Sequence, residues 1–177
     1  QENYNGIATV NGHSYANFKT PNTNFALLVS EKFTEPFKEP IQYGQHIARL
    51  ANMLGGGILV QRFGDLLEGR RSTPERINAN VITPTLTCAT PGDLSLVIPY
   101  RQMTSIIEML QALDKIAPGT ASRYTLLYGI EVKFYSARVK LTNELETEGV
   151  KNLFTIGDGA GVTRGLLQAS ASGVHVA

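Results

Sequence analysis

Apolar positions repeat at helical spacing in two stretches of the chain. The first stretch ends at Gly55, where a glycine commonly terminates a helix, and its apolar positions are Tyr43, Ile47, Leu50, Ala51 and Leu54. The second ends at Pro118-Gly119, and its apolar positions are Met103, Ile106, Ile107, Leu110, Leu113 and Ala117. The pattern therefore predicts two amphipathic helices.

Shorter apolar or alternating runs predict strands. Asn5-Gly6 and Asn11-Gly12 favour turns with positive φ on either side of residues 7–10, which predicts an opening hairpin. Further strands are expected at 25–29, 58–60, 93–98, 124–128, 130–134 and 138–141. This order of elements predicts an α+β fold, in which a mixed sheet is partly covered by helices.

The C-terminal stretch 153–177 combines an apolar run, a glycine-rich run and a helical pattern. Residues 153–156 predict a buried strand, and the glycines after them let the backbone turn sharply and leave it open to a ligand. A helix expected from near Thr163 would direct unpaired N–H groups at an anionic or electron-rich ligand. The carboxylate of Asp158 would repel a phosphate, so Asp158 fits better as an acceptor for hydroxyl groups.

This glycine-rich stretch is also compatible with other interpretations, which differ in what the rest of the sequence supports. A purely structural corner without a ligand stays open, because such corners are common in α/β proteins. The ADP-binding fingerprint G-x-G-x-x-G does not fit, because the spacing 159-161-165 is one residue too long and no acidic residue follows on a second strand. No metal site is expected at Asp158, since neither a second acid nor a His accompanies it.

Several segments together carry a resemblance to a known family. The segment GDGAGVTRGLLQASASGV resembles the C-terminal part of a family of uncharacterised bacterial FAD-dependent dehydrogenases or oxidoreductases, of the flavoprotein type with two dinucleotide-binding domains. The segments that resemble the same family elsewhere are NGHSYANF, NTNFALLVSEKFTEPF, LANMLGGGILVQRFGDLLEGRRST, TPGDLSLVIPYR and LYGIEVKFYSARVKL. From Thr147 to Gly157 the spacer is one residue longer than the usual pattern, which leaves the role of Thr147 open.

The resemblance implies a discontinuous FAD-binding domain. Residues 1–141 would form an inserted α+β substrate domain, and residues 142–177 would form the C-terminal part of the FAD-binding domain. The ADP-binding half would lie upstream, so this chain is expected to be a fragment that is inactive alone. Asp158 would bind a ribityl hydroxyl or lie near the pyrophosphate. The implied FAD contacts are Gly157, Asp158, Gly159, Ala160, Gly161, Val162, Thr163, Arg164 and Gly165.

Candidate substrate residues lie in the middle of the chain. Arg70 and Arg71 precede a short helix expected near Pro74, and they could hold an anionic group of substrate or of FAD. The alternative is a solvated face, in which nearby acids neutralise the arginines. On the expected sheet platform above a flavin ring, the polar residues of interest are Tyr100, Tyr135 and Arg138.

Composition and charge exclude several partners. The chain has 16 basic and 15 acidic residues, and this balance favours neither nucleic acid nor an acidic membrane surface. No apolar run reaches the roughly twenty residues of a membrane helix. The single cysteine, Cys88, is expected to be a small core residue, which together with the missing signal peptide predicts a cytoplasmic protein.

Two functions follow as expectations. In the first, the chain forms part of an FAD-dependent oxidoreductase that acts on a small-molecule substrate, and the flavin carries out the redox chemistry. The alternative is an isolated, non-catalytic α+β module that binds a partner or ligand through its sheet. The catalytic residues and the identity of the substrate do not follow from the sequence.

Overall fold

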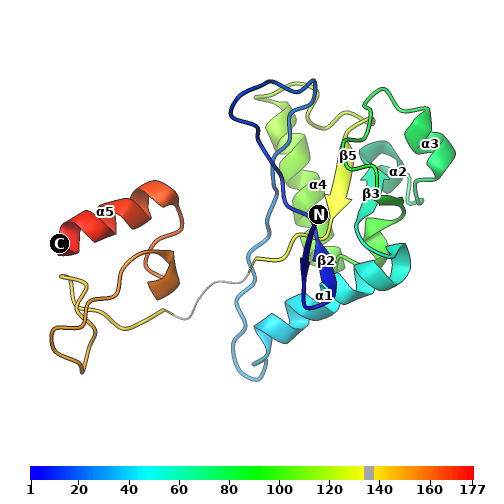
Figure 1. Cartoon of the computed structure of the whole chain (residues 1–177). Coiled ribbons are helices and arrows are strands. Elements are labelled where there is room, and N and C mark those ends of the chain that lie inside the picture. Colours follow the sequence, from blue (N-terminus) through cyan, green and yellow to red (C-terminus); the bar gives the residue numbers. More distant parts are fainter. Residues whose placement is uncertain (134–137) are drawn as a thin grey trace. The chain divides into compact units, whose positions relative to one another are not determined.

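A computed structural model describes residues 1–133 and 138–177 of the chain, and its fold is α+β, as predicted (Figure 1). The chain divides into two compact units, Gln1–Val132 and Lys133–Ala177. The first unit contains a two-stranded and a three-stranded sheet, four α-helices and a 3-10 helix, whereas the second contains turns, a short 3-10 helix and the last α-helix. The predicted domains, 1–141 and 142–177, stay a prediction.

The first unit opens with the predicted hairpin. Strand β1 (Glu2–Tyr4) pairs antiparallel with β2 (Ile7–Thr9). The turn between them places Asn5 at φ 50° and Gly6 at φ 76°, and two successive positive φ values match the twist of a tight hairpin. The backbone N–H of Val10 then donates to the carbonyl of Ile130, at 3.0 Å, which attaches the hairpin to the rest of the unit.

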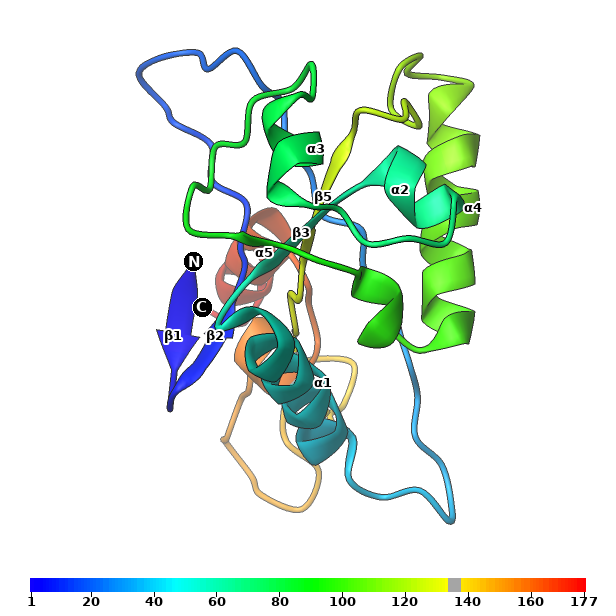
Figure 2. The same ribbon diagram turned by 90° about the vertical axis from the view of Figure 1, so that its right-hand side faces the viewer.

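The central sheet has the strand order β4-β3-β5. Its strands β3 and β5 are labelled in Figure 2. Strand β3 (Leu59–Arg62) pairs in parallel with β4 (Thr90–Pro91) and antiparallel with β5 (Leu126–Gly129). The sheet is therefore mixed, as predicted. Leu59, Val60 and Gln61 of the middle strand are buried, so β3 lies at the centre of the unit.

The two periodic stretches form the two long helices. Helix α1 (Pro40–Gly55) begins at a proline, which suits a first helical turn, and its cap residue is Gly56 at φ 68° rather than the predicted Gly55. Helix α4 (Tyr100–Asp114) ends before Ala117, the last residue of the predicted stripe. None of the helices in the described ranges has the length and apolar character to cross a membrane.

Two short helices follow β3. Helix α2 (Phe63–Leu67) was not predicted, and it continues directly from the strand. Helix α3 (Pro74–Asn78) confirms the prediction near Pro74, with Thr73 as the cap whose hydroxyl accepts from the Arg76 backbone N–H at 3.4 Å. The turn between α2 and α3 brings charged side chains back beside the end of β3.

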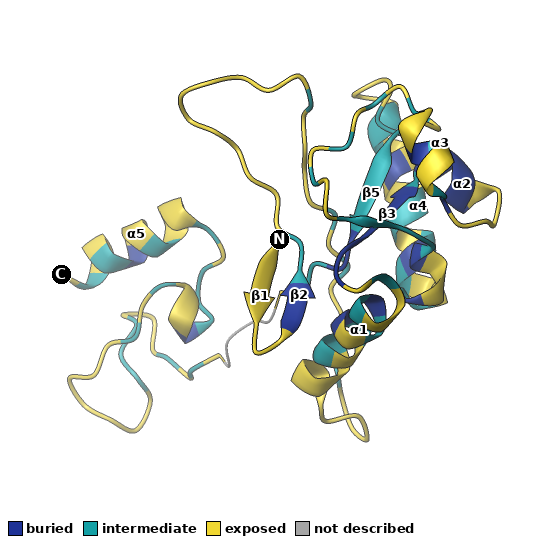
Figure 3. Cartoon of the chain, turned by 45° about the vertical axis from the view of Figure 1, so that its right-hand side comes forward, coloured by how far each residue is buried: buried dark blue, intermediate teal, exposed yellow. Residues whose placement is uncertain are grey.

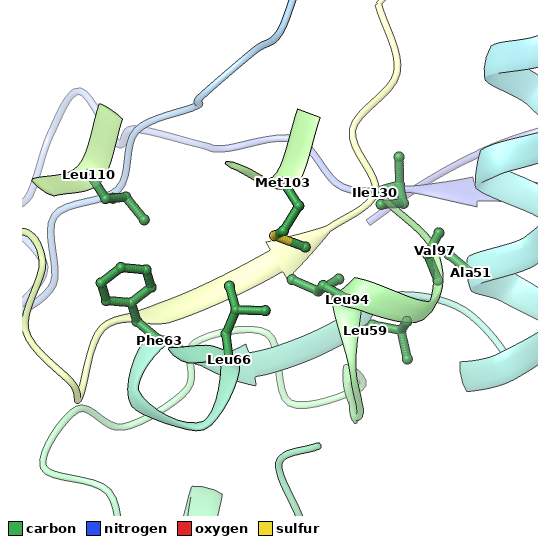
Figure 4. Close-up of a cluster of buried hydrophobic side chains, with 9 residues drawn as sticks. All are labelled: Ala51, Leu59, Phe63, Leu66, Leu94, Val97, Met103, Leu110 and Ile130. Carbon is green, nitrogen blue, oxygen red and sulfur yellow. The ribbon is translucent and has the colours of Figure 1, made fainter. Parts of the chain in front are cut away.

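The hydrophobic core joins these elements around β3 (Figures 3 and 4). Helix α4 contributes two fully or nearly buried side chains, and α2 contributes two more that lie between α4 and β3. The remaining members come from α1, β3, the turn after Asp93 and the segment after β5. The cluster consists of Ala51, Leu59, Phe63, Leu66, Leu94, Val97, Met103, Leu110 and Ile130. This core fixes the end of β3 and the turn that follows α2.

Four predictions for the first unit are wrong. Residues 93–98 form the 3-10 helix η1 (Leu94–Leu96) and not a strand, because the Asp93 carboxylate accepts from the Ser95 N–H at 2.9 Å and closes a turn. Residues 25–29 are not a strand, and neither are 130–133, the described part of the predicted strand 130–134, since neither run pairs along its length in a sheet; residue 134 lies outside the described residues. Cys88 is exposed rather than in the core, and its Sγ lies 3.3 Å from Oε1 of Gln1.

The second unit also departs from expectation. Residues 153–156 do not form a buried strand: Phe154 makes one isolated bridge to Glu146, and Leu153, Phe154 and Ile156 are exposed. Residues 138–141 likewise make a single bridge, from Leu141 to Thr147. The 3-10 helix η2 (Asp158–Ala160) and helix α5 (Leu166–Val176) follow.

Candidate functional site

The glycine-rich turn adopts conformations that need glycine at two positions. Gly157 has φ 73° and ψ −166°, a region that residues with a Cβ hardly ever occupy, and Gly161 has φ 67°. At Gly159 no atom lies within 4 Å of the position that a Cβ would take, so its Cα faces open space. The turn is therefore both specified by glycine and approachable along its main chain.

The carboxylate of Asp158 lies at the start of this turn and is exposed to solvent. The Thr163 hydroxyl donates a hydrogen bond of 2.6 Å to Asp158 Oδ1. This contact orients the carboxylate, because the turn brings the two side chains together across η2 and Gly161. A carboxylate that accepts from one hydroxyl has the chemistry to accept from a hydroxyl of a ligand.

Two further contacts fasten the turn within its unit. The Gly157 N–H donates to Ser172 Oγ at 3.0 Å, and the Ser172 hydroxyl donates to the Ala169 carbonyl at 2.7 Å. Ala160 is buried, and its carbonyl accepts from the Val139 N–H at 3.3 Å. Sequence reasoning missed Ser172, because a serine within a small-residue helix gives no signal of which backbone group it will reach.

The residues expected at the start of the last helix precede it. Helix α5 begins at Leu166 with Gly165 as its cap residue, so Val162, Thr163 and Arg164 form the connection from η2 and are not helical. The prediction of a helix start near Thr163 is therefore wrong by three residues. The extended backbone of Gly165 and the Thr163 contact to Asp158 explain the later start, since both hold the chain out of helical geometry.

The candidate substrate residues fall in both units. Arg70 and Arg71 are exposed in the turn between α2 and α3, and Tyr100 is the exposed first residue of α4. Arg138 is exposed in the unit Lys133–Ala177, and Tyr135 lies outside the described residues. The platform expected from Tyr100, Tyr135 and Arg138 stays a prediction.

Of the three acids near Arg70, Glu68 and Glu75 are exposed, as the solvated-face interpretation expects, whereas Asp65 is buried. Asp65 Oδ1 accepts from Arg70 Nε at 2.9 Å, and Asp65 Oδ2 accepts from the buried Ser72 hydroxyl at 2.8 Å. Arg62 Nη1 lies 3.7 Å from Oδ2, and Arg76 Nε lies 4.0 Å from Oδ1. Three guanidinium groups therefore surround one buried carboxylate.

Burial and hydrogen bonding act on the pKa of Asp65 in opposite directions. Burial raises the pKa of this carboxyl, whereas the hydrogen bonds from Ser72 and Arg70 and the positive charges of Arg62 and Arg70 lower it. The lowering effects are larger in sum, so the pKa of Asp65 lies below its ordinary value and the group is ionised at neutral pH. The sequence signal that was available is the spacing of Arg62 and Asp65 at the end of a strand.

No metal centre is found among the described residues, since they contain no group of three or more His, Cys, Asp or Glu side chains that could hold an ion. A shallow, open hollow does lie beside the start of α1. Aromatic, basic and acidic side chains line it, including Phe33, Tyr43, His46 and Arg49. His46 is exposed there.

Comparison with known proteins adds two findings. The family model described as "FAD-dependent protein, C-terminal domain-like" matches residues 2–134, which include the network around Asp65 but not the glycine-rich turn. An uncharacterized protein of Clostridium beijerinckii (strain ATCC 51743 / NCIMB 8052) is 32% identical over 183 residues, which cover 97% of this chain and 33% of that protein. The chain thus spans about a third of the length of this relative.

Proposed function

Since the chain belongs to the FAD-dependent protein C-terminal domain-like family, we propose that it forms a substrate domain and a flavin-contacting segment of an FAD-dependent oxidoreductase. The observation that carries the proposal is the open main chain at Gly159 next to the exposed, oriented carboxylate of Asp158. These features suit a polyhydroxylated ligand that approaches the backbone closely. FAD, when bound, would supply the redox chemistry.

The glycine-rich turn would hold the flavin through main-chain and carboxylate contacts. Asp158 would accept a hydrogen bond from a ribityl hydroxyl, in the way that it accepts one from Thr163. The backbone from Gly159 to Gly165 would face the cofactor, and the two positive φ values at Gly157 and Gly161 keep this backbone in place. Within unit 2, Ser172 acts as a support for the turn rather than as a ligand contact.

Substrate contacts are proposed at the arginines and tyrosines named above. Arg71 is exposed and could pair with an anionic substrate group, and Tyr100 offers an exposed phenol. Arg70 contributes less, because its guanidinium already pairs with Asp65 and Glu68. Tyr135 and Arg138 belong to the same proposal.

The whole protein would contain an upstream half that binds the ADP moiety of FAD. A relative about three times as long as the aligned region supports this proposal. Exposed apolar side chains on α5, among them Leu166, Leu167 and Val174, also support it, because a helix with such a face is better packed against further protein. The same exposed face is the observation that favours the second candidate, a non-catalytic interaction module.

The test compares the full-length parent protein with the 177-residue chain. We expect the parent to purify yellow with stoichiometric flavin, and its upstream sequence to contain a strand–GxGxxG–helix unit. The isolated chain should be colourless, because a ligand held at one turn and one helix end gains only about 1 kcal/mol from the helix dipole. A parent protein without flavin absorbance and without the upstream glycine motif would reject the oxidoreductase in favour of the interaction module.

A further inference from the structure

The ion-pair network at the end of β3 contains more cations than anions. In the described part of the chain, it joins two carboxylates, Asp65 and Glu68, to four arginines, which are Arg62, Arg70, Arg76 and Arg123. The neighbouring acid Glu75 is exposed; its carboxylate interacts with the Thr73 side chain and, more weakly, with the charges of Arg71 and Arg76, so adding Glu75 and Arg71 to the count leaves the balance of charge unchanged. The network therefore carries an excess of positive charge.

This excess is concentrated on two of the arginines. Both oxygens of Asp65 already accept short hydrogen bonds, from Arg70 and from Ser72. Glu68 pairs with Arg70 and with Arg123. The contacts of Asp65 to Arg62 and Arg76, at 3.7 and 4.0 Å, are longer than hydrogen bonds. Arg62 and Arg76 thus share a carboxylate whose hydrogen bonds go to other residues.

Arg62 is the more constrained of the two. Its side chain is only 12% exposed, and its Nε donates to Asn80 Oδ1 at 3.1 Å. Its guanidinium carbon lies 5.7 Å from the centre of the Tyr124 ring. Burial of a charge without a hydrogen-bonded counter-ion is unfavourable, so an anion that reached Arg62 would gain more than one at a solvated arginine.

Arg76 provides the side that is open to solvent. Its side chain is 36% exposed, and its Nη1 donates to the Arg71 carbonyl at 3.0 Å, which holds the guanidinium beside Asp65. We propose that Arg62 and Arg76 together form a binding site for a phosphoryl group, with Asp65 as the carboxylate that positions both guanidiniums. Planar guanidinium groups bind phosphate oxygens through paired hydrogen bonds, and a doubly charged anion matches the excess charge of the network.

The test is a titration of the flavin-free 177-residue chain with inorganic phosphate, at constant ionic strength maintained with chloride. Binding is followed by NMR, through the backbone amides of the segment 62–76 and the arginine Nε–H signals. We expect saturable shifts at Arg62 and Arg76. Arg76→Gln should weaken phosphate binding by about tenfold or more, because it removes charge-assisted hydrogen bonds.

Two further variants make the result specific. Arg62→Lys retains the positive charge but loses the paired N–H donors of the guanidinium, so it should also weaken phosphate binding. A thermal melt checks that this variant is folded. Arg101→Gln, an exposed arginine on α4, should leave the affinity unchanged. The proposal is overturned if wild type shows no saturable shifts, if Arg76→Gln binds as tightly as wild type, or if acetate binds as tightly as phosphate.

The source of the phosphoryl group follows from a parallel titration with pyrophosphate and ADP. Equal affinity for the two indicates that the site recognises the phosphoryl group alone, and tighter binding of ADP indicates a nucleotide; both outcomes support the site. Because no flavin enters this experiment, its failure would leave the oxidoreductase proposal standing. Failure of the flavin experiment would in turn leave this site unaffected.

Discussion

The Gly157 backbone N–H donates a hydrogen bond of 3.0 Å to the hydroxyl of Ser172, fifteen residues later in the chain. Ser172 is buried, and its hydroxyl in turn donates a hydrogen bond to the Ala169 carbonyl. The glycine-rich turn and α5 are therefore connected through one side chain. Because Gly157 occupies a conformation reserved for glycine, this bond holds the backbone at the point where the turn begins.

Replacement of Ser172 by alanine should loosen the turn. Ser172→Ala leaves the Gly157 N–H without its acceptor, and the loss of one such bond costs about 1–3 kcal/mol. Amide hydrogen exchange should show faster exchange at Gly157 and through the first turns of α5. The matched control is Ser170→Ala on the exposed side of the same helix. Equal exchange in the two variants would show that the Ser172 contact does not stabilise the turn.

The glycines of the turn should differ sharply in their tolerance of a Cβ. Gly157→Ala forces alanine into a glycine-only region and should destabilise the second unit by about 1–3 kcal/mol. Gly159→Ala should be nearly neutral in the absence of ligand, since its φ is ordinary and open space surrounds the added atom. Thermal melts of both variants test this difference. A Gly159→Ala variant as unstable as Gly157→Ala would contradict the described geometry.

The local parts of the fold could be predicted, because short-range rules determine them. Helical spacing gave α1 and α4, and Asn5-Gly6 gave the hairpin turn. The prediction of a strand at residues 153–156 is wrong because an apolar run becomes a strand only when it pairs with another segment, and pairing depends on residues far away in the sequence. The prediction of a strand at residues 93–98 is wrong because the Asp93 side chain closes a local turn, which competes with the extended backbone of a strand.

In the candidate sites, too, the features set by neighbouring residues could be predicted and those set by distant residues could not. The glycine-rich composition predicted a sharp turn, and the structure gives two of its glycines, Gly157 and Gly161, a positive φ; which of the glycines need it did not follow from the sequence. The network around Asp65 could not be predicted, because residues from β3, α2, the following turn and α3 meet only in the folded chain. Sequence reasoning took its acids as solvated, whereas the core beneath α2 buries Asp65.

Asp158→Ala should weaken FAD binding in the full-length parent. A charge-assisted hydrogen bond contributes about 1.5–3 kcal/mol, and about 1.4 kcal/mol is a factor of ten in affinity. We therefore expect a loss of about one to two powers of ten, measured by titration of FAD into the apoprotein. Thr163→Val serves as a comparison, because it removes the orienting hydroxyl but keeps the carboxylate, and should have a smaller effect. Equal affinity of wild type and Asp158→Ala would remove Asp158 from the flavin site.

The stability of the first unit should fall in acid because of Asp65. Burial raises the pKa of this carboxyl, but the Ser72 and Arg70 hydrogen bonds and the nearby guanidiniums outweigh burial, so its folded pKa lies below the ordinary value of 3.8. The unfolded chain therefore binds a proton at higher pH than the folded chain does. The stabilisation is fully present above the unfolded pKa and is lost as the pH falls through the folded pKa.

The variant Ser72→Ala tests how the ionisation of Asp65 contributes to stability. The hydrogen bond from the Ser72 hydroxyl is the largest of the effects that lower the Asp65 pKa, and the Ser72 oxygen also accepts from the Arg62 backbone N–H at 2.9 Å. The variant leaves two buried groups without partners, and we expect a loss of about 1–3 kcal/mol for each at neutral pH. In the folded variant, the pKa of Asp65 should rise toward its value in the unfolded chain. The free energy of unfolding of the variant should therefore fall less than that of wild type between about pH 5 and about pH 3. Urea unfolding across this range provides the measurement, with Ser105→Ala on the exposed face of α4 as the control. If wild type and Ser72→Ala lost stability in parallel on acidification, the Ser72 hydroxyl would not control the ionisation of Asp65.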